Sequence, residues 1–340
     1  MGIFDGGYDG PRGIRAVSVS ISVVMSVRDA GPYLGPTIES ILAQEGVDLE
    51  LLVVDDGSAD GSGDVLREFA HRDGRVRIFR QDGRGLTEAL ILACGEARGR
   101  YIARHDAADL SRPGRLARQQ RALDAEPRLA FASCWTEYRG PRMEYLYTTR
   151  DSGTAREPAD VVVEKGGTVT LADAPTHHGS VMFRRDVYER VGGYRREFYL
   201  AQDRDLWFRM AEAGLYQALP EALYVALVLP ASRSSSFRDV QHRLGRLARR
   251  AFELRHAGQS EAEVLELASG LRPRGSAHGA RRIAAANYFI GEALRRNEDR
   301  RCLGYLGRAV RLRPFHAGGW VRLLQAGAAS RIGRWRAGPG

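Results

Sequence analysis

Carboxylates occur directly after apolar segments of this 340-residue chain, at positions where a ligand could meet them. The segment LELLVV at 49–54 leads into an Asp-Asp pair, and YIARH at 101–105 leads into a D-A-A-D run. The residues concerned are Asp55, Asp56, Asp106 and Asp109. Such side chains can accept hydrogen bonds, take a proton from a reacting hydroxyl or hold a divalent cation. The alternative is turn and capping chemistry alone, because Asp-Asp-Gly-Ser is also a common turn sequence.

The elements that carry these carboxylates alternate between two periodicities. Short β-branched apolar segments predict buried strands, and apolar residues at helical spacing predict helices between them. The expected strands cover 17–27, 49–54, 76–80 and 101–105, and the expected helices cover 33–44, 63–72 and 85–97. This alternation predicts an open, mostly parallel α/β sheet, in which ligands bind beyond the carboxyl ends of the strands. Arg28 and the carboxylates should therefore lie along one edge of that sheet.

The rest of the chain has a different organisation. Residues 131–230 predict mixed strands and loops, with an amphipathic helix around 203–213 that has Asp203 at its start. Residues 236–330 have helical periodicity throughout. We therefore expect four regions, which are a flexible lead over 1–16, an α/β domain over 17–230, a basic helical domain over 231–330 and a basic tail over 331–340.

Composition and histidine spacing exclude several classes of protein. The cysteines are Cys94, Cys134 and Cys302. They are far apart and odd in number, which excludes a disulfide scaffold and a paired-CxxC zinc site. Adjacent His177 and His178 would point apart on a strand, with no further ligands expected near them, so a zinc pair is not expected either. Residues 1–16 lack the features of a secretory signal, and no apolar run approaches the roughly 18 residues of a spanning helix. We expect a reducing, cytoplasmic location.

Positive charge is concentrated in the C-terminal third of the chain. Residues 231–340 contain 22 arginines and eight acidic residues, an excess of +14 within a total of +9. Such a region attracts anions, so we expect an anionic partner, either lipid headgroups or a polyanionic acceptor. Nucleic acid is not expected, because no known binding module accompanies the charge and the aromatic residues are scattered. A solvated helical surface is the alternative.

Five segments, in order, resemble family-two inverting glycosyltransferases with the GT-A fold. They cover 20–44, 49–62, 80–90, 97–119 and 177–214, and include VVDDGS, YIARHDAAD and AQDRDLWFRM. The resemblance implies a mixed, mostly parallel sheet flanked by helices, to which the C-terminal helices are added. It also implies transfer of a sugar from a nucleotide-activated donor to an acceptor hydroxyl, with inversion.

The resemblance assigns roles to individual residues. Asp56 corresponds to the family's carboxylate that accepts a hydrogen bond from the nucleobase, with Asp55 beside it. Asp106 would contact the ribose of the donor. Asp203 corresponds to the general base that takes the proton of the acceptor hydroxyl. His178 falls where the family places residues on the acceptor side of the cleft.

The expected base pocket departs from the family pattern. Arg28 stands where the family has the Tyr of a V-Y-N run, and Ser26 stands where it has Pro. A guanidinium can stack on a base or contact a phosphate. We therefore count Ser26 and Arg28 among the donor-binding residues, without the uridine preference that is commonest in the family.

The metal-binding motif departs as well. The family's D-x-D-D reads D-A-A-D here, so Ala108 occupies the position of a ligating carboxylate. Leu229 stands where the family often has a histidine ligand. We therefore expect a weak or absent Mg²⁺ or Mn²⁺ site, with Asp106 and Asp109 as the residues available to it.

Two functions remain open from the sequence. In the first, the chain is an active transferase whose leaving group is stabilised by arginines, a helix dipole or a displaced metal. In the second, it is a catalytically inactive GT-A module kept for binding or scaffolding. Retention of Asp56, Asp106 and Asp203 favours the enzyme, and the missing ligands favour the binding module. Relatives often act on lipid-linked or polymeric acceptors at the inner membrane face, so the resemblance also favours peripheral membrane contact for the basic region.

Overall fold

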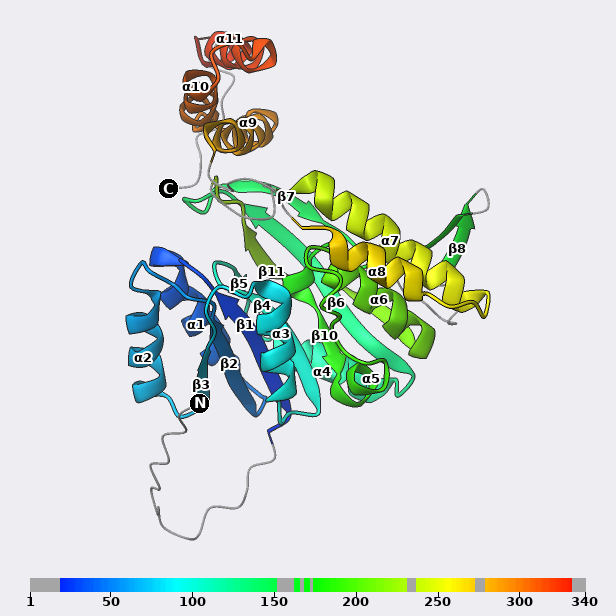
Figure 1. The fold of residues 1–340 in the computed structure, drawn as a ribbon. Helices are drawn as coiled ribbons and strands as arrows, with labels where there is room; N and C mark the ends of the chain where they lie inside the picture. Colours follow the sequence, from blue (N-terminus) through cyan, green and yellow to red (C-terminus); the bar gives the residue numbers. More distant parts are fainter. Residues whose placement is uncertain are drawn as a thin grey trace.

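The computed structural model describes residues 19–151, 162–165, 168–171, 174–230, 237–272 and 279–331. The expected lead over 1–16 and nearly all of the tail over 331–340 lie outside these residues. Within them, helices flank a mixed sheet and further helices stack at one end of the molecule (Figure 1). None of the helices described has the length and apolarity to span a bilayer.

Parallel strands form the N-terminal half of the sheet. They are β1 (Ile21–Val27), β2 (Leu49–Asp55), β3 (Val76–Arg80) and β4 (Tyr101–Asp106). Their order is β3-β2-β1-β4, with every neighbouring pair parallel. Ser26 of β1 pairs in register with Val54 of β2 and with Asp106 of β4, so the carboxyl ends of these strands lie side by side. The expected α/β sheet is confirmed over 21–106, with its first strand beginning at Ile21.

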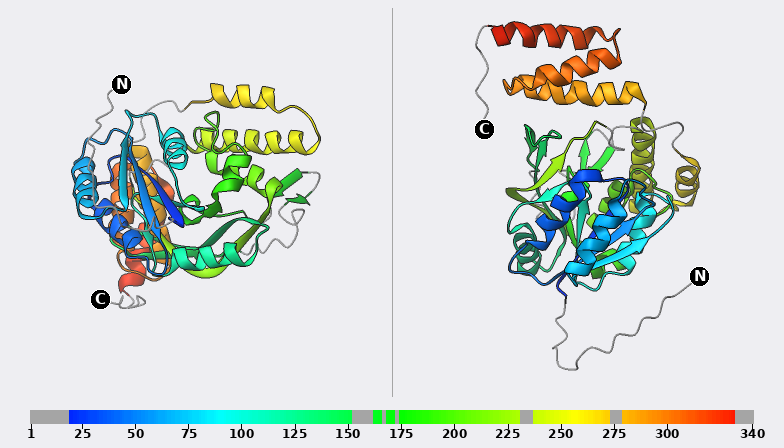
Figure 2. Two further views of the ribbon diagram at one scale, coloured as in Figure 1. Left: turned by 90° about the horizontal axis from the view of Figure 1, so that it is seen from below. Right: turned by 90° about the vertical axis from the view of Figure 1, so that its left-hand side faces the viewer.

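Helices cover both faces of the sheet. One face carries α1 (Leu34–Leu42), α2 (Ser62–Arg72) and α4 (Arg115–Ala125), and the other carries α3 (Leu86–Gly95), α5 (Arg185–Arg190) and α6 (Gln202–Ala213) (Figure 2). In β1, Val23 and Met25 pack on the α1 side, and Val24 packs on the α3 side. Burial on both faces explains why β1 and β2 are apolar at successive positions.

The second half of the sheet is mixed. It contains β5 (Leu110–Ser111), β6 (Leu129–Arg139), β7 (Tyr145–Thr149), β10 (Met182–Arg184) and β11 (Leu215–Leu227). β10 lies antiparallel between β4 and β6, β11 is parallel to β6, and β7 is antiparallel to β6. β8 (Val162–Lys165) and β9 (Thr168–Leu171) form a separate antiparallel pair. The expected GT-A architecture, a sheet flanked by helices, is confirmed.

Two further helices pack directly on the α/β layer. They are α7 (Arg238–His256) and α8 (Ala262–Gly270). Phe208 of α6 stacks on Phe252 of α7, with ring centroids 4.9 Å apart, inside a cluster that includes Ala268 of α8. These helices therefore share a core with α6, whereas the domain boundary at 230 stays a prediction.

The last helices form a stack beside β7. They are α9 (Ala280–Arg296), α10 (Cys302–Leu312) and α11 (Ala317–Arg331). Leu146 of β7 packs in one apolar cluster with Ile290 of α9 and Leu306 of α10. The Asn297 side chain donates hydrogen bonds to the backbone carbonyls of Tyr145 and Leu146, at 3.1 and 2.7 Å. The stack thus rests on the sheet through β7.

Candidate active site

Three side chains that could ligate a metal lie together beyond the carboxyl end of β4. Asp106 ends the strand, Asp109 follows in the next turn, and His177 precedes the 3₁₀ turn His178–Ser180. Nε2 of His177 lies 3.9 Å from Oδ2 of Asp106 and 3.6 Å from Oδ2 of Asp109. One ligand atom from each residue lies within 4.8 Å of the other two.

A buried cation lies beside these carboxylates. Arg104 precedes Asp106 by two residues in β4, so both side chains fall on the same face of the strand. The Arg104 guanidinium lies 2.6 Å from Oδ1 of Asp106, although only 1% of the Arg104 side chain is exposed. Burial alone would raise the pKa of Asp106, but the charge of Arg104 outweighs it and lowers that pKa below its ordinary value. Asp106 is therefore ionised at neutral pH.

Asp109 and His177 are affected in other ways. Burial raises the pKa of Asp109, and the negative charge of Asp106 raises it further. The backbone N–H of Leu227 opposes this shift by donating to Oδ1 of Asp109 at 2.9 Å. Burial lowers the pKa of His177 to about 4, so its ring is neutral at pH 7. The cluster is thus a fixed carboxylate, a carboxyl group that favours its proton and a neutral imidazole.

The three ligand atoms suit a hard divalent cation, but two contacts weaken the metal site. Carboxylate oxygens and an imidazole nitrogen are accepted ligands of Mg²⁺ and Mn²⁺, which take further ligands from water or phosphate. Asp106, however, is already paired with Arg104. In addition, Nδ1 of His177 accepts the backbone N–H of Gly179 at 3.1 Å, which leaves the proton of the neutral ring on Nε2. Ligation through Nε2 would break that contact, so the residues present fit a weakly held cation.

The expectation that no further ligands lie near the two histidines is wrong for His177. The 3₁₀ turn folds back over the end of β4, where the carbonyl of Val181 accepts the N–H of Arg104 at 2.8 Å. This long-range contact brings His177 to two carboxylates that are distant in the sequence. The histidines do point apart, as expected, because Nε2 of His178 lies 2.7 Å from the hydroxyl of Tyr194.

Asp56, expected to bind the donor base, is held in place by the turn after β3. It is 1% exposed, and its Oδ1 accepts hydrogen bonds from Nε2 of Gln81 at 2.7 Å and from the N–H of Gly85 at 3.1 Å. Arg28 lies 3.7 Å from its other oxygen. Gly85 has φ of +93°, and a Cβ there would collide with Tyr199. Only glycine lets this backbone N–H reach Asp56 without strain.

The remaining donor-side residues divide into two kinds. Ser26 is half-buried at the end of β1, beside Asp106 in register. Asp55 instead accepts the N–H of Ser58 at 2.9 Å, which is the turn-capping contact considered as the alternative for this sequence. The structure therefore brings Ser26, Arg28, Asp56 and Asp106 to one edge, while Asp55 stabilises the turn that follows β2.

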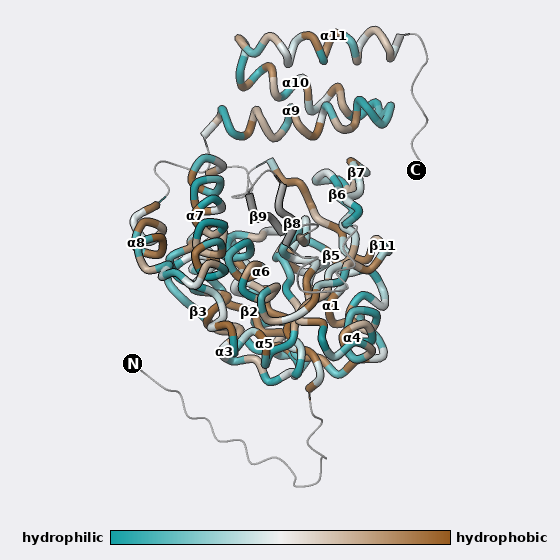
Figure 3. Tube along the Cα trace, turned by 90° about the vertical axis from the view of Figure 1, so that its right-hand side faces the viewer, coloured by the Kyte–Doolittle hydropathy of each residue, from teal (hydrophilic) through white to brown (hydrophobic). Residues whose placement is uncertain are grey.

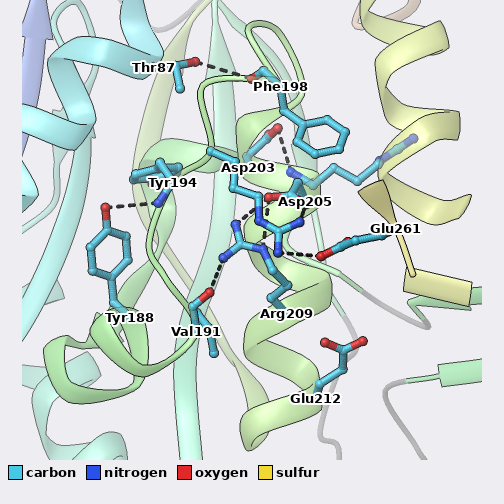
Figure 4. A network of polar contacts seen from close by, with 12 residues as sticks. Thr87, Tyr188, Val191, Tyr194, Phe198, Asp203, Asp205, Arg209, Glu212 and Glu261 are labelled. Atoms are coloured by element: carbon cyan, nitrogen blue, oxygen red, sulfur yellow. Dashed lines mark hydrogen bonds and ion pairs between the residues drawn. The ribbon is translucent and has the colours of Figure 1, made fainter. Parts of the chain in front are cut away.

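Asp203, expected to be the general base, is the second residue of α6 (Figure 4). It is half-buried, and its Oδ1 accepts the backbone N–H of Arg204 at 2.9 Å. Burial raises the pKa of Asp203 above its ordinary value, and the charge of Arg104 acts in the opposite direction. Asp203 and Asp106 therefore both feel the charge of the same buried guanidinium.

Tyr194 contacts His178 and lies within electrostatic range of Asp203. Its hydroxyl contacts His178 at 2.7 Å. Burial raises the pKa of Tyr194 well above its ordinary value, and the nearby negative charge of Asp203 adds to that shift. The structure thus brings the expected acceptor-side histidine and the expected base to the same region.

A buried ion network holds the first turn of α6 (Figure 4). Asp205 is fully buried and pairs with Arg209 one turn later. Arg195 lies 3.7 Å from the other oxygen of Asp205 and 2.8 Å from Glu261, the residue before α8. The network fixes the helix end that carries Asp203 and ties it to the C-terminal helices.

Three residues of this region were missed from the sequence. Arg104 could have been found, because strand alternation places it on the same face as Asp106. His177 and Tyr194 gave no such signal, since each reaches the site through loop geometry that periodicity does not report.

The chain is similar to known glycosyltransferases. Residues 22–192 match the model of glycosyl transferase family 2. EpsE of Bacillus subtilis (strain 168), a glycosyltransferase by its name, is 31% identical over 209 residues, which are 60% of this chain and 71% of EpsE. The succinoglycan biosynthesis protein ExoO of Rhizobium meliloti (strain 1021) is 41% identical over 106 residues, which are 31% of this chain and 30% of ExoO.

Solved structures share the fold. TarS of S. aureus, residues 1–349, aligns with a TM-score of 0.51 at 14% identity, over 93% of this chain and 92% of that one. The mannosyltransferase PcManGT from Pyrobaculum calidifontis, solved with GDP-Man and Mn²⁺, aligns with a TM-score of 0.52 at 18% identity, over 91% and 86% of the two chains. The family match spans half of this chain, and EpsE is covered over more than two thirds of its length. The chain belongs to glycosyl transferase family 2.

Proposed function

We propose that this chain transfers a sugar from a nucleoside diphosphate sugar to an acceptor hydroxyl, with inversion and with Asp203 as general base. The observation that carries the proposal is the position of Asp203 at the fixed start of α6, with a pKa raised by burial. A carboxylate of raised pKa is a better proton acceptor than an exposed one.

The proposed reaction is a displacement at the anomeric carbon of the donor sugar. Asp203 takes the proton of the acceptor hydroxyl while the acceptor oxygen bonds to the anomeric carbon of the donor sugar. The bond from that carbon to the diphosphate oxygen breaks, and the nucleoside diphosphate leaves with the bonding electron pair. Attack from the face opposite the leaving group inverts the anomeric carbon.

The donor would lie along the ends of β1, β2 and β4. Asp56 would accept a hydrogen bond from the base, and Arg28 would stack on the base or contact phosphate. Solved relatives of the same fold hold UDP-GlcNAc, in TarS, and GDP-Man, in PcManGT. These two donors are the first to test. Asp55 would act on the donor only indirectly, through the turn it caps.

A metal ion would assist only weakly. Asp106 and Asp109, with His177, would hold a Mg²⁺ or Mn²⁺ ion that neutralises charge on the leaving diphosphate. Arg104 already supplies a fixed positive charge beside Asp106. The proposal keeps the cytoplasmic location that the cysteine usage predicts.

Two measurements test the proposal. Nucleotide sugars are screened by thermal shift with and without Mn²⁺, because a bound donor stabilises the fold by mass action. Transfer to a mixed saccharide acceptor pool is then measured for the wild type, Asp203→Asn and the exposed control Asp186→Asn. We expect Asp203→Asn to lower kcat by roughly two to four orders of magnitude and to leave donor binding intact.

The outcomes separate the two functions. Loss of transfer with intact donor binding in Asp203→Asn, and normal transfer in Asp186→Asn, support the enzyme. Near-normal transfer by Asp203→Asn would remove this residue from the mechanism. Donor binding by the wild type, with no transfer to any acceptor, would favour the catalytically inactive binding module instead.

A further inference from the structure

The outer face of α11 exposes apolar side chains at helical spacing. Trp320, Val321 and Leu324 are 45%, 49% and 69% exposed. They lie one, three and four positions apart, so they share one face of the helix. The opposite face packs inward, where Ala326 is fully buried and Gly319 approaches Val310 of α10. α11 thus has two apolar faces. Among the described residues, the inner face is covered by neighbouring helices, and the outer face is not.

The turn between α10 and α11 extends this surface. Phe315 is 100% exposed and Leu312 is 40% exposed. The indole N–H of Trp320 donates to the carbonyl of Pro314 at 2.7 Å, which holds the tryptophan against the turn. We call Leu312, Phe315, Trp320, Val321 and Leu324 the α11 patch. Large apolar side chains that are exposed together in this way mark an interaction surface.

The charge around the patch has one sign. Residues 302–340 contain seven arginines and no aspartate or glutamate. Arg311 and Arg313 flank Leu312 and are exposed, and no carboxylate pairs with either of them within the described part of the chain. The arginines nearer the body differ, because Arg295 and Arg296 both pair with Glu292. Arg311 and Arg313 therefore place uncompensated positive charge beside the α11 patch.

We propose that the α11 patch docks on the surface of an anionic lipid bilayer. Exposed Phe, Trp and Leu side chains beside arginines are the chemistry of an interfacial membrane contact, in which the apolar groups enter the headgroup boundary and the guanidinium groups contact lipid phosphates. A second copy of this chain is a poorer occupant. A two-fold contact would place the Arg311 and Arg313 pairs of both copies close together, where like charges repel.

The position of the patch agrees with this role. α11 is the outermost layer of the helical stack, on the far side of α9 and α10 from the sheet, and Figure 3 shows apolar residues along it (Figures 2 and 3). A series of ring contacts leads from the site towards the stack. It runs from His177 to Tyr138 at 5.7 Å, to Tyr147 at 4.6 Å and to Phe289 of α9 at 6.1 Å. A docked α11 would therefore place the helical stack between the bilayer and the candidate site. The lipid contact is independent of the proposed transfer reaction.

Vesicle co-sedimentation of the full chain tests the docking. The vesicles contain phosphatidylcholine alone, or phosphatidylcholine with about one third phosphatidylglycerol. We expect the wild type to pellet with the anionic vesicles at low salt, to remain in solution with the neutral ones, and to lose binding at high salt because the attraction is screened.

Two pairs of variants assign the binding to the patch. Phe315→Ser with Leu324→Ser should weaken binding by at least about tenfold, since apolar insertion contributes in proportion to buried area. Leu267→Ser is the matched control, because Leu267 of α8 is 55% exposed and lies outside the patch. Arg311→Gln with Arg313→Gln should weaken binding by roughly tenfold to 30-fold. Arg243→Gln with Arg246→Gln, two exposed arginines of α7, is the charge control.

Each result decides the proposal. Unchanged thermal unfolding midpoints show that the variants fold. If the variant with both apolar substitutions does not fold, the variant with both arginine substitutions still tests the proposal. Wild-type binding by both patch variants, or equal binding to neutral and anionic vesicles, overturns the lipid contact. Self-association without lipid, measured by sedimentation velocity, also overturns the proposal if it is lost in Phe315→Ser with Leu324→Ser. The patch would then bind a second copy of the chain.

Discussion

The guanidinium of Arg104 lies 2.6 Å from the carboxylate of Asp106 at the end of the central strand β4, nearly shielded from solvent. A charge held in this way acts strongly, because the surrounding dielectric is low and no reorganisation is needed. It stands beside the position where Ala108 offers no ligand. In the proposed mechanism, this fixed cation would take part of the electrostatic role of a divalent ion.

Replacing this cation should change the acid sensitivity of the site. In Arg104→Met, Asp106 loses the charge that lowers its pKa, so the pKa rises and Asp106 becomes protonated in mildly acidic solution. As the pH is lowered, the donor affinity of Arg104→Met, measured by calorimetry, should then begin to fall at a higher pH than that of the wild type. Arg104→Lys keeps the charge and should keep the wild-type profile. An identical pH profile for Arg104→Met and the wild type would show that Arg104 does not affect donor binding.

Removal of metal should have a small effect. We expect EDTA to lower transfer by less than about tenfold, since the ion would be held by Asp106, Asp109 and His177 against competing contacts. Ala108→Asp restores the missing carboxylate and should raise the affinity for Mn²⁺, measured by calorimetry. Ala107→Asp, which adds the same charge one position earlier, is the control. If transfer by the wild type requires Mn²⁺ absolutely, the interpretation of D-A-A-D as a weakened motif is wrong.

The pH dependence of transfer should report Asp203. The base must be ionised, so kcat/KM should fall as pH decreases through the pKa of Asp203, and burial places that midpoint above the ordinary aspartate value of 3.8. Arg204→Gln removes a positive charge that lowers this pKa, so the acidic limb should move to higher pH. The exposed Arg190→Gln should leave it in place. An acidic limb that does not move in Arg204→Gln would belong to another group.

The sequence predicted the strands and helices of the α/β layer to within a few residues at each end. The expected strand over 101–105 is β4 (Tyr101–Asp106), and the expected helix over 203–213 is α6 (Gln202–Ala213). Periodicity succeeds there because each element buries its apolar residues on a regular face, and a regular face leaves a period in the sequence. The same reasoning placed Asp56 and Asp106 at one edge of the sheet.

Contacts made by loops could not be predicted in this way. His177 reaches Asp109 because a 3₁₀ turn crosses the end of β4. The packing of α11 on α10 leaves one apolar face of α11 facing outward. Neither fact has a local period. The sequence predicted helical periodicity over 236–330, and periodicity does not show which face of a helix its neighbours cover.

The two acidic residues at the start of α6 should respond oppositely to the loss of their charge. Asp205 lies between Arg209 and Arg195, so Asp205→Asn leaves two close guanidinium groups with a neutral amide and should lower the free energy of unfolding by about 3–5 kcal/mol. Asp203 differs, because burial raises its pKa and the folded state therefore binds its proton more tightly than the unfolded chain does. Its ionised form opposes folding at neutral pH, so Asp203→Asn should leave stability unchanged or raise it while transfer is lost. Urea unfolding of both variants, with Asp186→Asn as the exposed control, measures the contrast. Equal destabilisation by Asp203→Asn and Asp205→Asn would mean that Asp203 belongs to the structural network and not to the chemistry.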